Sequence, residues 1–102
     1  MKIQVFIGMT RKEIIYKINA KIDLNELGHE LVFDTGLYDL EEKEIQVIFK
    51  NTGYVTDILT PDHGLIFLPI KPGMLQPGLN EIQLLFTMGT SEELSPLIQW
   101  EI

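Results

Sequence analysis

The two histidines, His29 and His63, are the residues best suited to acid–base or metal chemistry in this sequence. Neither has a partner at a spacing typical of metal sites, and neither has a nucleophile nearby. His63 lies within Asp62-His63-Gly64, which could be a fragment of a catalytic site but is also ordinary sequence for a hairpin turn. We therefore expect both histidines to be solvated turn residues.

Carboxylates occur in two runs that could bind a cation: Glu41, Glu42 and Glu44 in the first, Glu92 and Glu93 in the second. A calcium loop needs spaced oxygens, as in D-x-[DN]-x-[DN]-G, and no such string occurs. The phosphate-binding patterns G-x-x-x-x-G-K-[ST] and G-x-G-x-x-G are also absent from the sequence. We expect no metal site, no cofactor and no enzyme activity. A small enzyme that uses scattered carboxylates is a weaker alternative, because acids far apart in sequence can meet in the fold.

Length, composition and charge limit the classes of protein to consider. A chain of 102 residues with 45% apolar content can build one core, so we expect a single domain over residues 1–102. The net charge of −7 opposes binding to nucleic acid or to an anionic membrane surface. Because there is no cysteine, neither a disulfide framework nor a thiolate metal site can form.

No stretch of the sequence predicts membrane insertion or export. No window approaches the roughly 20 apolar residues that a membrane-spanning helix needs. The amino terminus, MKIQVFIGMTRKEIIYK, is interrupted by polar residues and lacks the apolar core of a signal peptide. We expect a soluble protein that is made in the cytoplasm without a signal peptide and has no membrane partner.

Alternation of apolar and polar residues with period two is the main secondary-structure signal, and it predicts strands with one buried face. Over residues 13–24 the even positions are apolar, while the odd positions from 17 onward are polar. A helical stripe also exists there, but strand is favoured because helix propensity is modest. The same alternation occurs in 2–7, 44–50, 80–88 and 98–102.

Turn residues separate these runs at short intervals. Glycine supplies positive φ and proline presets a turn, and such residues recur throughout the sequence, including two prolines and two glycines in 71–78. This spacing favours an all-β domain, an antiparallel sandwich or barrel, over βαβ units.

Five apolar residues fall on strand faces that are otherwise polar. A second buried surface, whether another sheet of this chain or a partner, would explain them. The candidate interface residues are Phe6, Ile15, Ile48, Leu85 and Leu97.

Tyr38 and Tyr54 lie next to predicted turns. Most other aromatic residues fall on core faces, whereas exposed tyrosines could stack on sugar rings. These two residues are therefore candidates for ligand stacking in an alternative function, a carbohydrate-binding or adhesive module that recognises host cell-surface polysaccharide.

From Leu31 onward, the order of strands and turns resembles the amino-terminal domain of the baseplate upper protein of phages infecting Gram-positive bacteria. The matching features, which cover about the last 70 residues, are LVFD, TG, Asp39-Leu40, EIQVIFK with Asn51-Thr52-Gly53, the turn at Asp62-His63-Gly64 before LIFLPI, MLQPGLNEIQLLF, and LIQWEI.

This resemblance implies an antiparallel immunoglobulin-like β-sandwich of about 7–9 strands. It further implies a structural protein of the phage tail or baseplate, located in the virion. Its partners would be other tail or baseplate proteins and copies of itself, in a trimer or a higher ring. The resemblance supplies no catalytic residues, and we expect the chain to act through protein–protein contacts.

Overall fold

The computed structural model describes residues 1–10, 13–37 and 40–102, and this part of the chain consists mainly of β-strands. The elements are β1 (Lys2–Phe6), β2 (Tyr16–Ile18), β3 (Glu30–Asp34), the 3-10 helix η1 (Leu40–Glu42), β4 (Glu44–Phe49), β5 (Tyr54–Val55), β6 (Leu65–Pro69), β7 (Leu79–Met88), β8 (Ser91–Leu94) and β9 (Ile98–Glu101). The prediction of an all-β chain is confirmed. No helix among the described residues has the length and apolar character needed to cross a membrane.

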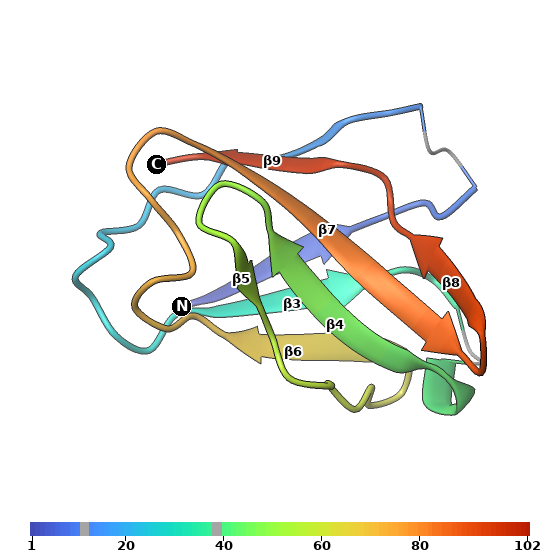
Figure 1. Cartoon of the computed structure of the whole chain (residues 1–102). Coiled ribbons are helices and arrows are strands. Elements are labelled where there is room, and N and C mark those ends of the chain that lie inside the picture. Colours follow the sequence, from blue (N-terminus) through green and yellow to red (C-terminus); the bar gives the residue numbers. More distant parts are fainter. Residues whose placement is uncertain (11–12, 38–39) are drawn as a thin grey trace.

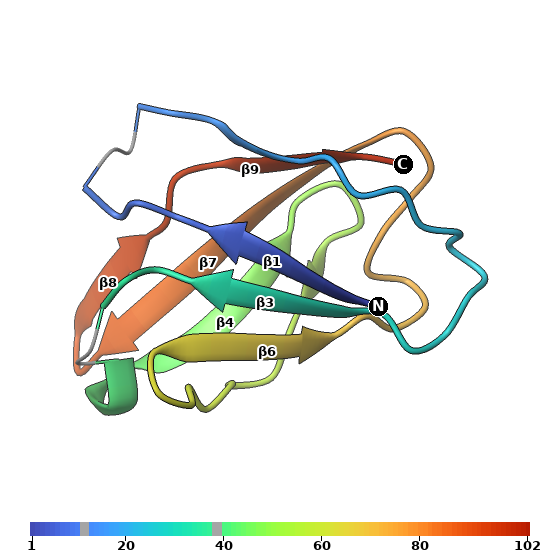
Figure 2. The ribbon, with the colours of Figure 1, turned by 180° about the vertical axis from the view of Figure 1, so that it is seen from behind.

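The strands form two sheets that lie in two layers (Figure 1). One sheet has three strands in the order β1-β3-β6, which Figure 2 shows from its own side. The other has the order β2-β9-β7-β4-β5, and β8 pairs with β7 next to β9. β7 is the central strand of this larger sheet, because it pairs with β4 along one side and with both β9 and β8 along the other.

Both sheets are mixed, so the prediction of purely antiparallel strands is wrong at two pairings. β1 runs parallel to β3, and β2 runs parallel to β9. Parallel neighbours need a crossover connection. Between β1 and β3 the chain makes this crossover by contributing β2 to the other sheet (Figure 2).

The inner faces of both sheets fill one core, as the alternation predicted. Ile3, Val5 and Ile7 are buried, and so are the alternate residues of β4, β7 and β9, namely Ile45, Val47, Phe49, Ile82, Leu84, Phe86, Ile98 and Trp100. Met88 differs: it follows the same alternation but lies at the exposed end of β7.

Residues 13–24 form less strand than predicted. Only Tyr16–Ile18 pairs as β2, and Ile14 is exposed. Burial nevertheless alternates from residue 16 to residue 24, with the odd positions exposed. The helical alternative is wrong, because this segment lies extended along the edge of the sheet, where two side chains hold it. The Trp100 Nε1–H donates to the Ala20 carbonyl at 2.7 Å, and the Gly8 N–H donates to the Tyr16 hydroxyl at 3.0 Å.

Side-chain hydroxyls complete the hydrogen bonding of the two central strands where regular pairing stops. The Val47 N–H donates to Thr56 Oγ1 at 2.9 Å, and the Thr56 N–H donates back to the Val47 carbonyl at 3.1 Å. In the same way, the Leu84 N–H donates to Ser95 Oγ at 2.9 Å. Pro96 follows Ser95 and has no N–H to donate, so the break between β8 and β9 falls there.

Thr56→Val tests the first of these hydroxyls. The substitution keeps the β-branched shape but leaves the buried Val47 N–H without an acceptor, so we expect a loss of about 1–3 kcal/mol in the free energy of unfolding. Urea denaturation followed by tryptophan fluorescence measures it. Thr87→Val, on the outer face of β7, is the control and should change stability by less than about 0.5 kcal/mol. Equal losses in the two variants would contradict this role for Thr56.

Candidate functional site

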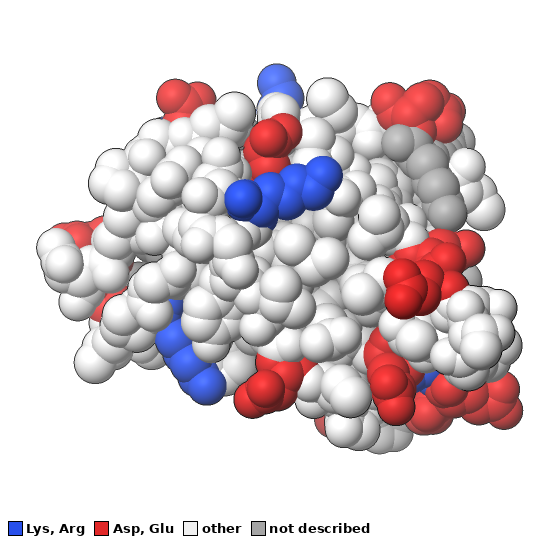
Figure 3. Space-filling view, in the orientation of Figure 1, with Lys and Arg blue, Asp and Glu red and all other residues white. Residues whose placement is uncertain are grey.

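The outer face of the six-stranded sheet carries apolar side chains in its middle and charged ones toward its ends. Strand alternation turns every second residue of β4 and β7 away from the core. We name this surface the β4–β7 face and define it by the outward residues Glu44, Gln46, Ile48, Val55, Glu81, Gln83, Leu85, Thr87, Glu92 and Leu94. Figure 3 views the molecule from this side.

The strand register arranges these residues in rows across the sheet. Ile48 pairs with both Gln83 and Val55, which makes one row. The next row has Leu85 between Gln46 and Leu94.

A third row, at the far end of β7, is acidic. It has Thr87 between Glu44 and Glu92. The apolar residues therefore lie in two neighbouring rows, with Glu44 and Glu92 beyond them at one end and Glu81, next to Lys50, at the other.

A shallow groove of about 700 Å³ runs over the apolar rows. Its lining residues are Ile48, Gln83, Leu85, Glu92, Glu93, Leu94 and Ser95. Leu94 is 45% exposed, and Val55 beside Ile48 is 51% exposed. Exposed apolar surface grouped in this way, with a polar rim, is typical of a protein-binding surface.

Two glutamines within this face each donate one side-chain hydrogen bond to a backbone carbonyl of the chain itself. Gln46 Nε2 donates to the Thr56 carbonyl at 3.0 Å, and Gln83 Nε2 donates to the Ser95 carbonyl at 2.9 Å. A partner could cover these side chains without removing those hydrogen bonds. The face is therefore less costly to desolvate than its composition suggests.

Two of the five predicted interface residues lie on this face. Ile48 and Leu85 occupy its two apolar rows. Ile15 and Leu97 each precede the paired residues Tyr16 and Ile98 by one position, and the Tyr16 N–H donates to the Leu97 carbonyl at 2.9 Å. Ile15 and Leu97 thus lie next to the β2–β9 pairing, away from β4, and their place in an interface stays a prediction.

Phe6, the fifth predicted residue, lies elsewhere. It pairs with Asp34 on the outer face of the three-stranded sheet and is 64% exposed. The structure therefore places Phe6 on a different sheet from Ile48 and Leu85, and a role for it in an interface stays a prediction.

Charge around the β4–β7 face is uneven, a feature that the sequence analysis missed. Acidic side chains gather at the end where β8 and η1 lie, while much of the surface over β4 and β7 is uncharged (Figure 3). The distribution of charged residues along the sequence is itself uneven. Residues 1–22 hold five of the eight basic residues and one acid, whereas residues 23–102 hold three basic and fourteen acidic residues.

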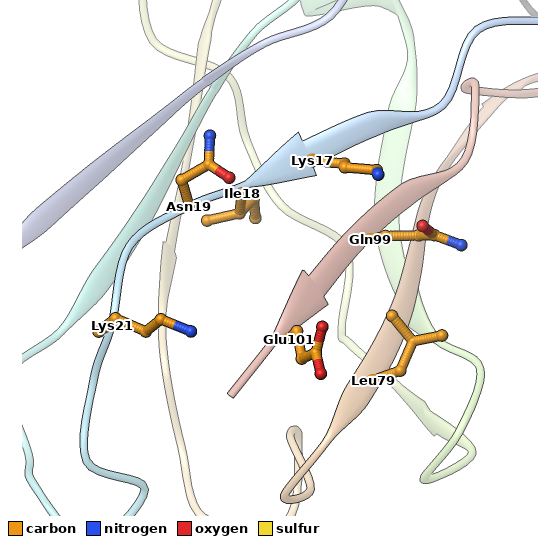
Figure 4. A pocket seen from close by; sticks show the side chains of 7 residues that line it. All are labelled: Lys17, Ile18, Asn19, Lys21, Leu79, Gln99 and Glu101. Atoms are coloured by element: carbon orange, nitrogen blue, oxygen red, sulfur yellow. The ribbon is translucent and has the colours of Figure 1, made fainter.

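A polar depression of about 210 Å³ lies beside the β2 edge of the same sheet (Figure 4). Its lining residues are Lys17, Ile18, Asn19, Lys21, Leu79, Gln99 and Glu101. The amine of Lys21 is directed toward the carboxylate of Glu101, and Leu79 closes one side. The depression therefore adds lysine amines to the end of the sheet remote from β8.

The histidines do not meet in a common site. His29 is buried, with Nε2 3.0 Å from Glu26 Oε2. The prediction that it is a solvated residue is wrong: the residue directly precedes β3, only 8% of its surface is exposed, and its carbonyl accepts a hydrogen bond from the Ile70 N–H at 2.9 Å.

His63 is solvated, as predicted, and lies in a tight turn. The backbones of Asp62 and Leu65 exchange two hydrogen bonds, and both central residues have positive φ, 50° for His63 and 79° for Gly64. This is the geometry of a hairpin turn, so the interpretation of Asp62-His63-Gly64 as turn sequence is confirmed. Within the described ranges, no three residues among His, Cys, Asp and Glu are grouped closely enough to hold a metal ion.

Of the two tyrosines considered for sugar stacking, Tyr38 lies outside the described residues. Tyr54 is half-buried and packs edge to face against Phe49, with ring centroids 6.3 Å apart and an interplanar angle of 78°. Its ring therefore takes part in an intrachain contact. Val55, the next residue, is the member of β5 that reaches the β4–β7 face.

No protein-family model matches this chain, and no curated protein matches it.

A pair of identical substitutions in β4 tests whether the apolar residues of the face serve the fold. Ile45→Thr places a hydroxyl in the core at a fully buried position and should cost about 2–4 kcal/mol in the free energy of unfolding. Ile48→Thr, three residues along the same strand, should cost less than about 1 kcal/mol because its side chain lies on the outer face. Chemical denaturation of both variants measures the difference. If the two variants lose similar amounts of free energy of unfolding, Ile48 contributes to stability as a core residue does.

Proposed function

We propose that this chain is a structural module of a phage tail or baseplate, an immunoglobulin-like β-sandwich that acts by binding other proteins rather than by catalysis. The two-layered, all-β arrangement fits that class. The observation that carries the proposal is the β4–β7 face, where Ile48, Leu85 and Leu94 are exposed or half-buried on the outer side of the larger sheet. The setting in a tail comes from the resemblance of the strand and turn order.

The chemistry of such a module is burial of apolar surface within a polar rim. Each Å² of apolar surface removed from water contributes about 25 cal/mol, which is why grouped apolar side chains favour association. The flanking residues Glu44 and Glu92 provide the rim. Charges at a rim contribute mainly to specificity and to the rate of association. The partners would be other tail proteins and copies of this chain, assembled in the virion.

A carbohydrate-binding function has weaker support from the site. Sugar recognition by stacking needs an aromatic face open to solvent. Tyr54 is half-buried against Phe49, and the groove on the β4–β7 face is lined by aliphatic, polar and acidic side chains. Aliphatic surface suits a protein partner better than a sugar ring.

Immunogold labelling tests the location. An antibody raised against the purified chain, applied to phage particles produced by a host that carries this gene, should label the tail or its tip. Label confined to the capsid, or particles that lack the protein, would contradict a tail function. Particles of a phage from which this gene has been deleted, treated with the same antibody, control for cross-reaction and should carry no label.

Light scattering coupled to gel filtration tests the mode of action, with negative-stain microscopy of the same fractions. We expect species larger than the 11.7 kDa monomer. A chain that stays monomeric at every attainable concentration, and that binds no tail protein produced with it, would overturn the proposal.

A further inference from the structure

We propose that the β4–β7 face binds the same face of a second copy, related by a two-fold axis that sets β4 antiparallel to the partner β4. This inference rests on the proposed assembly function and names one partner for it. A two-fold interface uses one patch twice, so the patch must be complementary to itself after rotation. The β4–β7 face is complementary to itself in three respects: its charges, its apolar rows and its hydrogen bonding.

The charges at the two ends of β4 are opposite. Glu44 begins the strand, and Lys50 directly follows its last residue, Phe49. The two residues are six positions apart, which in an extended chain is roughly 20 Å. Reversal of β4 about its midpoint, near Val47, brings Glu44 of one copy to Lys50 of the other, and this occurs twice in the dimer.

Both charges are available for such a contact. Glu44 and Lys50 are exposed, and within the described ranges neither forms an ion pair with another residue of the chain. Lys50 is held in place by its backbone, since its N–H donates to the Glu81 carbonyl at 2.9 Å. The lysine is thus anchored at its base while the amine is free to reach across an interface.

The same rotation superimposes the apolar rows. The row of Ile48 and Gln83 of one copy falls on the row of Leu85 and Gln46 of the other, because the two rows lie on either side of the midpoint. Each apolar side chain then meets the aliphatic part of a glutamine side chain. The glutamine amides keep their bonds to the carbonyls of Thr56 and Ser95, so covering them leaves those donors paired.

The outer face of the three-stranded sheet lacks these properties. Val32, at its centre, is already buried, with only 3% of its surface exposed. The Lys2 amine lies 5.8 Å from the ring centroid of Phe67 and 4.0 Å from Glu30 Oε1. Its charged side chain therefore covers apolar surface within the chain, which leaves Phe6 as an isolated exposed residue.

A charge swap tests the two-fold geometry, with the dimer dissociation constant measured by sedimentation equilibrium. Glu44→Lys alone and Lys50→Glu alone each replace two attractions by two repulsions, so each should raise the dissociation constant by about tenfold. The double variant, with both substitutions in one chain, restores opposite charges and should return to within about threefold of the wild type. An equimolar mixture of the two single variants should form heterodimers for the same reason.

Leu94→Ser tests the apolar part of the contact without altering these charges. Leu94 is 45% exposed, so the fold should tolerate the change, and circular dichroism with a urea titration checks this. The dissociation constant should rise by at least about tenfold. Phe6→Ser is the matched control on the other sheet and should leave the dissociation constant unchanged.

The outcomes separate this inference from the function on which it rests. Two results overturn the two-fold interface while leaving assembly through another surface in place. One is a Leu94→Ser variant with the same dissociation constant as the wild type. The other is a double charge variant that dimerises as weakly as the single charge variants. If the wild-type chain does not self-associate but the antibody detects it in phage tails, the interface alone is overturned. Absence from tails, together with a strict monomer that binds no tail protein, overturns both.

Discussion

The register of β7 determines both the core and the candidate site. This ten-residue strand pairs with β4 on one side and with β9 and then β8 on the other. Its inward residues Ile82, Leu84 and Phe86 are buried in the core, while the outward residues Gln83 and Leu85 lie at the centre of the β4–β7 face. Because side chains alternate strictly, a slip of one residue would exchange these two sets. Stability therefore selects the register, and the register in turn presents the outer face.

Two hydroxyls complete the hydrogen bonding of the central strands β7 and β4 where regular pairing stops. Between the end of β8 and the start of β9, Ser95 satisfies the Leu84 N–H, and Pro96 ends the pairing. In β4, on the edge remote from β7, Thr56 satisfies the Val47 N–H just beyond the short strand β5. Buried backbone groups left unpaired at these breaks would each be costly. The hydroxyls remove that cost, so pairing can stop between β8 and β9 and after β5 without leaving these N–H groups unpaired.

The sequence predicted the fold where a local pattern determines structure, and it failed where distant segments decide. Alternation identified the inward residues of β1, β4, β7 and β9, and glycine chemistry identified the turn at His63. The parallel pairing of β1 with β3 was not visible, because it depends on the chain crossing between sheets through β2. Apolar residues that break a polar face indicated Ile48 and Leu85, but period two cannot tell which sheet a face belongs to, and so Phe6 was grouped with them.

The net charge of −7 bears on how such a face could discriminate among orientations. Two copies with the same negative charge repel each other in most mutual orientations, and the acidic end formed by η1 and β8 strengthens that repulsion wherever two such ends meet. A contact that places Glu44 over Lys50 of the other copy keeps the acidic ends apart and pairs opposite charges instead. Apolar burial would then supply the affinity, and the uneven charge would reject the parallel arrangement, in which Glu44 meets Glu44. Specificity of this kind needs both an attractive and a repulsive element, and the two ends of β4 provide them.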